Sequence, residues 1–470
     1  MPMKPFLLLT VCAVAACSQV GPNFVAPSTG VDAQTTLPSA KGPSVKTAKQ
    51  SVPSWWSEVR DPHLGKLVNL AFETNADLRI ADANLRAARA LLGETKAAQG
   101  PSAILDASTE RSRIATPTGA GSRNSTAGPT NVSATLTWEL DLFGRVARQL
   151  EARRANEQVA VALRADILRL VAADIALAYV DLREAQQRRA VAMRNLENQR
   201  ETVRITSALV DAGRGTEIDT VRVRAALLST QATLPTFRAA ERAALNRLTT
   251  LIGRNPGTLD QELAPRGALP RLPQVVTVNS AQNLLRQRPD IRAAESALRE
   301  ATAEIGVNTA DLFPSIQLSG RVGASSGRPS DLSSSGASFF GLGPSVSLAL
   351  FDRNAIHQRV AQAKAAADAD LARYQQTIIT ALSEADTALA AFVREKERLF
   401  LLQKSVDASR RATELARIQF ESGSEPLLTV LDAERSLLTA EDETVVSQAS
   451  EARALILVYR AFGGGGSIVP

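Results

Sequence analysis

Residues 131–155 read NVSATLTWELDLFGRVARQLEARRA and join two segments with different hydrophobic periods. In the first segment apolar and polar residues alternate, which is typical of a β-strand with one apolar and one polar face. The apolar set is Val132, Ala134, Leu136, Trp138, Leu140 and Leu142, and the polar set is Ser133, Thr135, Thr137, Glu139 and Asp141. At Gly144 the alternation stops and a long, charged, alanine-rich stretch begins. The stretch therefore predicts a strand that runs directly into a helix.

The composition of the 470 residues favours long, closely packed helices over a thick globular core. Aromatic residues make up 4% of the chain and charged residues 22%, while Ala and Arg are abundant. The net charge of +6 is diffuse, without a basic stripe interleaved with aromatics, so nucleic acid is not expected as a partner. His63 and His357 have no Cys or His near them, so we expect no metal site and no cofactor. No nucleophile–base constellation stands out, and the chain is not expected to be an enzyme.

The N-terminus has the layout of a bacterial secretory signal. Lys4 precedes an apolar run over residues 6–14, and small residues follow up to Cys17. The segment is too short to span a membrane as a helix. Its tetrapeptide V-A-A-C resembles the lipobox, in which the Cys is acylated, for example with palmitate, and becomes the mature N-terminus. Ser18 after the Cys fits sorting to the outer membrane, whereas the alternative is an ordinary signal peptide with an incidental Cys.

Two halves of the chain follow the same plan, which indicates an internal duplication. The matching positions are Asp77 and Asp290, Pro101 and Pro314, Phe143 and Phe351, Arg145 and Arg353, and Gly213 and Gly423. Each half has the order helix, two strands, very long helix, turn, helix. The expected parts are a signal peptide (1–16), a lipid-anchored extended segment (17–60), repeat 1 (61–260), a linker (261–280), repeat 2 (281–462) and a flexible tail (463–470).

The predicted elements of the two halves are two strand pairs and two long helices. Strands are expected at about 102–112 and 131–142, then at 315–324 and 339–351, with exposed loops at 113–130 and 325–338. The long helices are expected at 144–211 and 353–421, each about 100 Å at ~1.5 Å per residue. Apolar positions in the second recur about every 3.7 residues, which favours nearly straight or slightly right-handed packing. These apolar positions also fit one side of an ordinary helical bundle, but the length of the helices favours a tube of helices.

Strands with one apolar and one polar face suit a water-filled transmembrane barrel. In the opening stretch Glu139 and Asp141 would face the lumen, and the alternative is a soluble sandwich layer covered by helices. Four strands cannot close a barrel, and an open edge in lipid leaves backbone groups unsatisfied. Copies of the chain must therefore share one barrel. Two copies would give eight strands and a filled lumen, three would give twelve and an aqueous pore, and the pattern does not fix the number.

Several motifs at fixed mutual spacing resemble the TolC-like outer-membrane factor family, specifically its lipoprotein branch. They are CSQVGPNFVAP (17–27), WWSEVRDPHLGKLVNLAFETNADL (55–78), RPDIRAAESALREATAEIG (288–306), LFPSIQLSG (312–320) and FESGSEPLLTVLDAERSLLTAEDE (420–443). The resemblance covers nearly the whole mature chain. It implies a homotrimer with a twelve-stranded antiparallel β-barrel, four strands per chain, continuing into a periplasmic α-helical barrel.

The resemblance also implies a function and partners. The chain would be a lipid-anchored channel of the bacterial outer membrane that extends into the periplasm, where a periplasmic adaptor protein and an inner-membrane RND-type pump dock. It would passively conduct drugs, metal ions or other small molecules out of the cell. The same architecture serves type I protein secretion, which is the alternative. A third hypothesis is a periplasm-spanning scaffold without a pore, which would require that the strands do not enter the membrane.

By the family pattern, the turns at Gly213 and Gly423 form the periplasmic tip and dock the adaptor, together with Asp219 and Glu425. A glycine at each turn fits a helix C-cap with positive φ. In the family a Tyr and an Arg contact the acid at the position of Asp219 and hold the channel closed. Phe420 and Glu425 stand at those two positions here, so we expect that latch to be absent.

The resemblance implies a pore constriction at Leu428 and Asp432, one turn apart on a helix. Three such carboxylates around an axis would attract cations. Asp432 also fits a solvated helix carboxylate or an intrachain partner of Arg435. Arg435 and Arg222 are candidates for charge pairing at the gate, and Arg214 and Arg224 are further candidates near the first turn.

Overall fold

The computed structural model describes residues 19–31, 37–40, 45–48, 55–57, 59, 61–118, 121–265, 267–270, 272–273 and 275–464. The chain divides into two compact units, which we describe separately. The sheet unit comprises the chain up to Pro27, Asn84–Val161 and Ala293–Gln375, and the hairpin unit comprises Ser28–Ala83, Ala162–Arg292 and the chain from Gln376 onward. The signal peptide and Cys17 lie outside the described residues.

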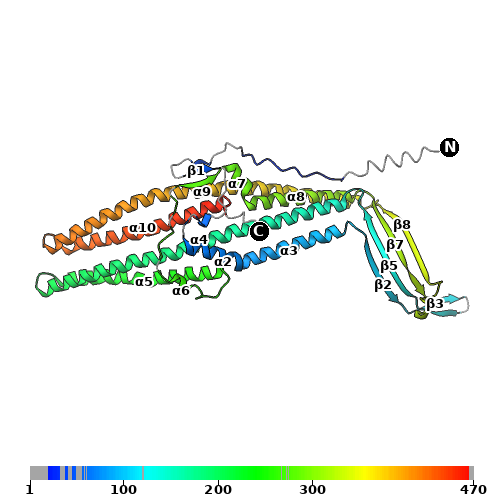
Figure 1. The fold of residues 1–470 in the computed structure, drawn as a ribbon, viewed down its shortest axis with the longest axis horizontal. Helices are drawn as coiled ribbons and strands as arrows, with labels where there is room; N and C mark the ends of the chain where they lie inside the picture. The colour runs from blue at the N-terminus through cyan, green and yellow to red at the C-terminus, as the bar shows by residue number, and fades with distance from the viewer. Residues whose placement is uncertain are drawn as a thin grey trace. The chain divides into compact units, whose positions relative to one another are not determined.

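The sheet unit contains a four-stranded antiparallel sheet (Figure 1). Its strands are β2 (Ser102–Thr109), β5 (Thr130–Leu140), β7 (Ser315–Ser326) and β8 (Ser338–Ser347), in the order β2-β5-β7-β8. The pairing of β5 with β7 joins the two halves of the chain. Three strands end earlier than the alternation predicts. One of them, β5, ends at a tight turn in which the Leu142 N–H donates to the Leu140 carbonyl at 2.8 Å.

The expected loop at 113–130 was wrong, because the chain forms a second hairpin there. Strands β3 (Ser112–Thr118) and β4 (Gly121–Ala127) pair antiparallel. These strands lack regular apolar alternation, so periodicity gave no signal for them. Backbone pairing alone needs no buried face. The second expected loop contains only a 3₁₀ turn, η3 (Pro329–Asp331).

The register of the four-stranded sheet separates apolar from polar side chains. One face carries Ala103, Leu105, Ala107, Val132, Ala134, Leu136, Trp138, Leu140, Ile316, Leu318, Val322, Ala324, Phe340, Leu342 and Val346. The other face is mainly polar, with Ser133, Thr135, Thr137, Glu139, Gln317 and Arg321 among its residues. In the single chain the apolar face lies open, as the exposed fractions of Phe340 (89%) and Leu342 (74%) show. The sheet thus has the apolar face and the polar face that the alternation in the sequence predicts.

The strand-to-helix junction at Gly144 is a built corner. Gly144 has φ of 79°, and an added Cβ would lie 2.9 Å from the Cα of Gln19. Asp141 was expected to face a lumen, but its carboxylate accepts from the Val146 and Ala147 N–H groups at 3.0 and 2.7 Å. It therefore caps the first turn of the following helix, where amides lack intrahelical partners.

The helices include two very long ones and their shorter partners. They are α2 (Pro62–Thr74), α3 (Ala76–Ala97), α4 (Arg145–Asp211), α5 (Glu217–Leu251), α6 (Asp260–Leu263), α7 (Ala281–Gln287), α8 (Pro289–Ala310), α9 (Arg353–Glu421) and α10 (Leu427–Ala461). Helices α4 and α9 agree with the long helices that the sequence predicts. None of the helices in the described part of the chain has the continuous apolar length that a membrane crossing requires.

The hairpin unit is built from two helical hairpins, α4–α5 and α9–α10. The middle of α4 packs through small residues, since Ala172, Ala173 and Ala176 are fully buried. At the end of α10, Trp55 stacks on Tyr459 with 5.2 Å between ring centroids. Part of the expected linker is ordered here: β6 (Val276–Asn279) pairs in parallel with β1 (Val45–Ala48) from the expected extended segment.

Candidate functional site: the turns of the two hairpins

The two hairpin turns share one backbone geometry and lie at the same end of the hairpin unit (Figure 1). After α4, Gly213 has φ of 71° and the Arg214 N–H donates to the Leu209 carbonyl at 2.8 Å. After α9, Gly423 has φ of 77° and the Ser424 N–H donates to the Gln419 carbonyl at 2.9 Å. This is the Schellman arrangement, and glycine provides the left-handed backbone that it needs.

Asp219 and Glu425 brace the starts of the helices that follow the turns. Asp219 is the N3 acid of a capping box on α5, and its Oδ2 accepts from the N–H of the N-cap residue Thr216 at 3.1 Å. The Thr216 hydroxyl also donates to this oxygen at 2.5 Å. Glu425 Oε2 accepts from the Thr429 hydroxyl at 3.1 Å beside the first turn of α10. Both acids are therefore held in place locally at the end of the unit.

Leu428 and Asp432 lie one turn apart on the exposed side of α10. Leu428 is 50% exposed, and the Asp432 side chain is 59% exposed. Asp432 Oδ1 lies 3.3 Å from Arg435 Nη2, so within one chain the acid has the intrachain partner considered from the sequence. An exposed i,i+3 pair of this kind stabilises a helix by only about 0.2–0.5 kcal/mol. Asp432 can therefore leave Arg435 at small cost.

Arg214, Arg222 and Arg224 are exposed near the first turn. Across the residues that the structure describes, none of the three makes a side-chain hydrogen bond or ion pair. The chain by itself therefore does not bring Arg222 to Asp432 or to Asp219.

The sequence did not predict the polar side chains that join the two hairpins at some distance from the turns. Arg188 of α4 binds Asp442 of α10 with two contacts of 2.8 and 2.9 Å. Glu434, also on α10, has only 7% of its side chain exposed. A signal was available, since Glu434 and Glu441 are a heptad apart and therefore share a helix face.

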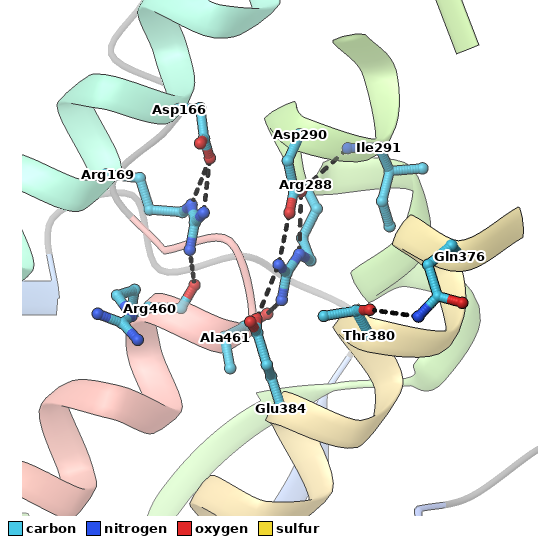
Figure 2. A network of polar contacts seen from close by, with 10 residues as sticks. All are labelled: Asp166, Arg169, Arg288, Asp290, Ile291, Gln376, Thr380, Glu384, Arg460 and Ala461. Atoms are coloured by element: carbon cyan, nitrogen blue, oxygen red, sulfur yellow. Dashed lines mark hydrogen bonds and ion pairs between the residues drawn. The ribbon is translucent and has the colours of Figure 1, made fainter. Parts of the chain in front are cut away.

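A second buried network holds the opposite end of α10 (Figure 2). The Arg288 side chain is 3% exposed and forms a bidentate pair with Asp290, whose atoms lie at 3.0 and 2.5 Å. Arg288 also donates to Glu384 of α9 at 2.9 Å and to the Ala461 carbonyl at 3.1 Å. One arginine thus connects α8, α9 and the last turn of α10.

Charge pairing decides the ionisation of this network. Burial by itself raises the pKa of Asp290, but its hydrogen bonds and charge interaction with Arg288 outweigh burial and lower that pKa. Arg169 adds a second donor, since its Nη1 reaches the Arg460 carbonyl at 2.7 Å while Asp166 holds its other nitrogens (Figure 2). Two buried guanidinium groups therefore satisfy two of the final carbonyls of α10, which have no partner within the helix.

Metal ligation has no support in the described part of the chain, where no group of three or more His, Cys, Asp or Glu residues could hold an ion.

Comparison with known proteins places this architecture in one family. A family model described as "Outer membrane efflux protein" matches residues 67–254 and 280–464. The chain belongs to the outer membrane efflux protein family, which is a family of transport proteins rather than of enzymes.

Individual relatives agree with this assignment. The chain is 30% identical over 465 residues to the outer membrane protein OprJ of Pseudomonas aeruginosa, a match that covers 97% of this chain and 95% of OprJ. It is also 30% identical over 455 residues to nodulation protein T of Rhizobium leguminosarum bv. trifolii, covering 96% and 92%. The solved structure of the outer-membrane channel OprN superposes with a TM-score of 0.89 at 37% identity, covering 96% of this chain and all of that one. The chain is accordingly an outer-membrane efflux protein.

Proposed function

We propose that three copies of the chain form the exit duct of a tripartite efflux pump. Each copy would contribute β2, β5, β7 and β8 to a shared twelve-stranded barrel. The strongest support is the sheet itself, whose apolar face is complete across all four strands and open in the single chain. Copies side by side would pair the free edges of β2 and β8 and so satisfy backbone groups that lipid cannot.

The helices would continue the barrel as a periplasmic tube. Two observations support an internal two-fold repeat. Helices α5 and α10 have equal lengths of 35 residues, and the two turns share one pattern of backbone hydrogen bonds. Three copies would then place six hairpins around one axis. The turns at Gly213 and Gly423 would dock a periplasmic adaptor, through which an inner-membrane RND-type pump supplies the driving force. The duct itself is passive.

Leu428 and Asp432 would narrow the tube near these turns. Their exposure on one side of α10 leaves them free to face a common axis. Three carboxylates at that level would favour cations, and the three leucines would narrow the opening and resist wetting. The weak pairing of Asp432 with Arg435 is consistent with this role, because the acid can be shared between copies.

Small-molecule efflux is preferred over type I protein secretion on two grounds. The lipobox-like sequence at Cys17 would anchor the chain to the outer membrane by lipid, as in the efflux branch of the family. The matching family model is described as "Outer membrane efflux protein", and the relatives ArpC and SrpC of Pseudomonas putida are outer membrane proteins of an antibiotic and a solvent efflux pump. Export of a polypeptide through the channel would favour protein secretion instead.

The experiment that tests the proposal is conductance in planar lipid bilayers. The wild-type trimer should give small, cation-preferring channels, and Asp432→Ala should raise the conductance and reduce the cation preference. Asp407→Ala is the matched control, because Asp407 is also exposed and pairs with an arginine three residues on, Arg410, at 3.7 Å. An equal conductance in both variants would remove Asp432 from the constriction, and monomers after cross-linking in detergent would contradict the shared barrel.

A further inference from the structure

Three charged side chains lie on the polar face of the four described strands β2, β5, β7 and β8, and they are Asp106, Glu139 and Arg321. Glu139 is neutralised locally, because the Arg145 guanidinium donates to both of its carboxylate oxygens. In the part of the chain that the structure describes, Arg321 forms no ion pair. Its positive charge is therefore available to solutes at this face of the sheet.

Two neighbouring strands hold the Arg321 side chain in place. Its Nε and Nη2 atoms donate to the Ser133 hydroxyl of β5 at 3.4 and 3.3 Å. Its Cζ atom lies 5.2 Å from the centre of the Phe339 ring of β8, within the range of cation–π attraction. Arg321 is exposed, but contacts with both β5 and β8 fix the position of its guanidinium group.

Glycine at position 323 makes room for this arrangement. The register places Ser133, Gly323 and Phe339 side by side on three strands, two residues along β7 from Arg321. Because Gly323 has no side chain, the position between Ser133 and Phe339 is open to the guanidinium. Strand β5 excludes a larger residue here, since an added Cβ would lie 2.3 Å from the Val132 carbonyl oxygen.

The guanidinium keeps hydrogen-bond donors that the chain does not use. An arginine carries five N–H donors, and in the described structure those on Nη1 of Arg321 have no partner. Carboxylates and similar anions accept from two parallel N–H groups of an arginine, so the Nη1 side offers a binding position for an anion.

Asp106 does not occupy these donors. It lies on β2, two strands away from β7 and therefore about 10 Å from it at ~4.8 Å per strand. Its charge weakens the field of Arg321 at a distance but leaves the guanidinium free to bind an anion.

We propose that Arg321 is an anion-binding residue that determines charge selectivity in the barrel section of the pore. The inference rests on the proposed channel function, because the polar face lines a pore only if copies of the chain close the barrel. Three guanidinium groups, one from each copy, would bind chloride or the carboxylate groups of passing solutes. Their effect on permeation is opposite in sign to that of the Asp432 carboxylates.

Charge substitutions at position 321 test the proposal. Arg321→Gln removes the charge and keeps a polar side chain, whereas Arg321→Lys keeps the charge. Arg328→Gln is the matched control, because Arg328 is also exposed, lies just beyond the end of β7 and makes no side-chain bond in the described structure.

The first measurement is the reversal potential of the trimer in a planar bilayer with different KCl concentrations on its two sides. Near 0.1 M KCl, Arg321→Gln should raise the ratio of potassium to chloride permeability about fivefold, which corresponds to the ~1 kcal/mol of one contact between unit charges in water. Arg321→Lys and Arg328→Gln should stay near the wild type. In 1 M KCl, where charges are screened beyond about 3 Å, the variants should converge.

The second measurement changes the charge at position 321 within one protein. Arg321→Cys should regain the wild-type permeability ratio after reaction with a cationic methanethiosulfonate, and an anionic one should raise the ratio further. The wild type treated with both reagents is the control. Equal ratios in Arg321→Gln and Arg328→Gln, an equal shift in Arg321→Lys and Arg321→Gln, or no response of Arg321→Cys would overturn the role of Arg321 alone. A wild-type protein without conductance would overturn the proposed channel.

Discussion

Replacing Arg288 with Met should release the last turn of α10. The guanidinium binds Asp290, Glu384 and the Ala461 carbonyl from a position that is 3% exposed (Figure 2). Removing one partner of a buried ion pair costs about 3–5 kcal/mol, because the remaining charge is left without compensation. Asp290 and Glu384 keep 25% and 48% of their side chains exposed, so water offsets part of that loss. We therefore expect the lower end of the range, about 3 kcal/mol.

The assay is hydrogen–deuterium exchange of peptides covering residues 455–464 in the detergent-solubilised trimer. Since each ~1.4 kcal/mol is a factor of ten in an opening equilibrium, exchange there should rise on the order of 100-fold. Arg292→Met is the matched control, as Arg292 lies in the first turn of α8, shortly after Arg288, is exposed and makes no side-chain bond in the described structure. If Arg288→Met changed exchange in these peptides by no more than Arg292→Met, the assignment of Arg288 as an anchor of α10 would be refuted.

Three further outcomes are expected. Because Arg288 lowers the pKa of Asp290, the stability that this pair contributes is present above the ordinary aspartate value of 3.8 and is lost as pH falls through the lowered pKa. Asp290→Asn should therefore remove this acid-dependent loss of stability, as measured by thermal unfolding at different pH values. If the loss persisted in Asp290→Asn, the pairing would be contradicted. Gly213→Ala and Gly423→Ala should each destabilise their turn by about 1 kcal/mol, because both glycines have positive φ. Gly65→Ala inside α2 should be neutral or stabilising, because an added Cβ has open space there. The measurement is hydrogen–deuterium exchange of the segment that carries each substitution. Cys17→Ser should abolish incorporation of labelled palmitate, and a variant that still carried the label would disprove the lipid anchor.

The strand faces and the long helices could be predicted from the sequence because both depend on local periodicity. Alternation over residues 131–142 predicted the apolar face of β5, and unbroken helical spacing predicted α4 and α9. Glycines after both long helices predicted the turns, since few other residues adopt positive φ. The β3–β4 hairpin escaped prediction because its pairing uses the backbone and has no apolar period.

The functional contacts needed the tertiary structure because their partners are far apart in the sequence. Asp141 could be assigned to a strand face from its position, but only the three-dimensional corner at Gly144 turned its carboxylate onto the amides of α4. Glu434 lies 232 residues from Thr202, and no pattern predicts a hydrogen bond over that separation. Arg288 lies 173 residues from the Ala461 carbonyl that it caps.

By itself, then, the sequence determined the long helices, the faces of the four-stranded sheet and the two hairpin turns, because these follow from neighbours within a few residues. The tertiary structure alone decided which charges are buried and which helices they tie together, because burial and pairing depend on distant segments packed side by side. That distinction separates Asp432, an exposed acid free to line a pore, from Glu434, two residues away and held between three helices.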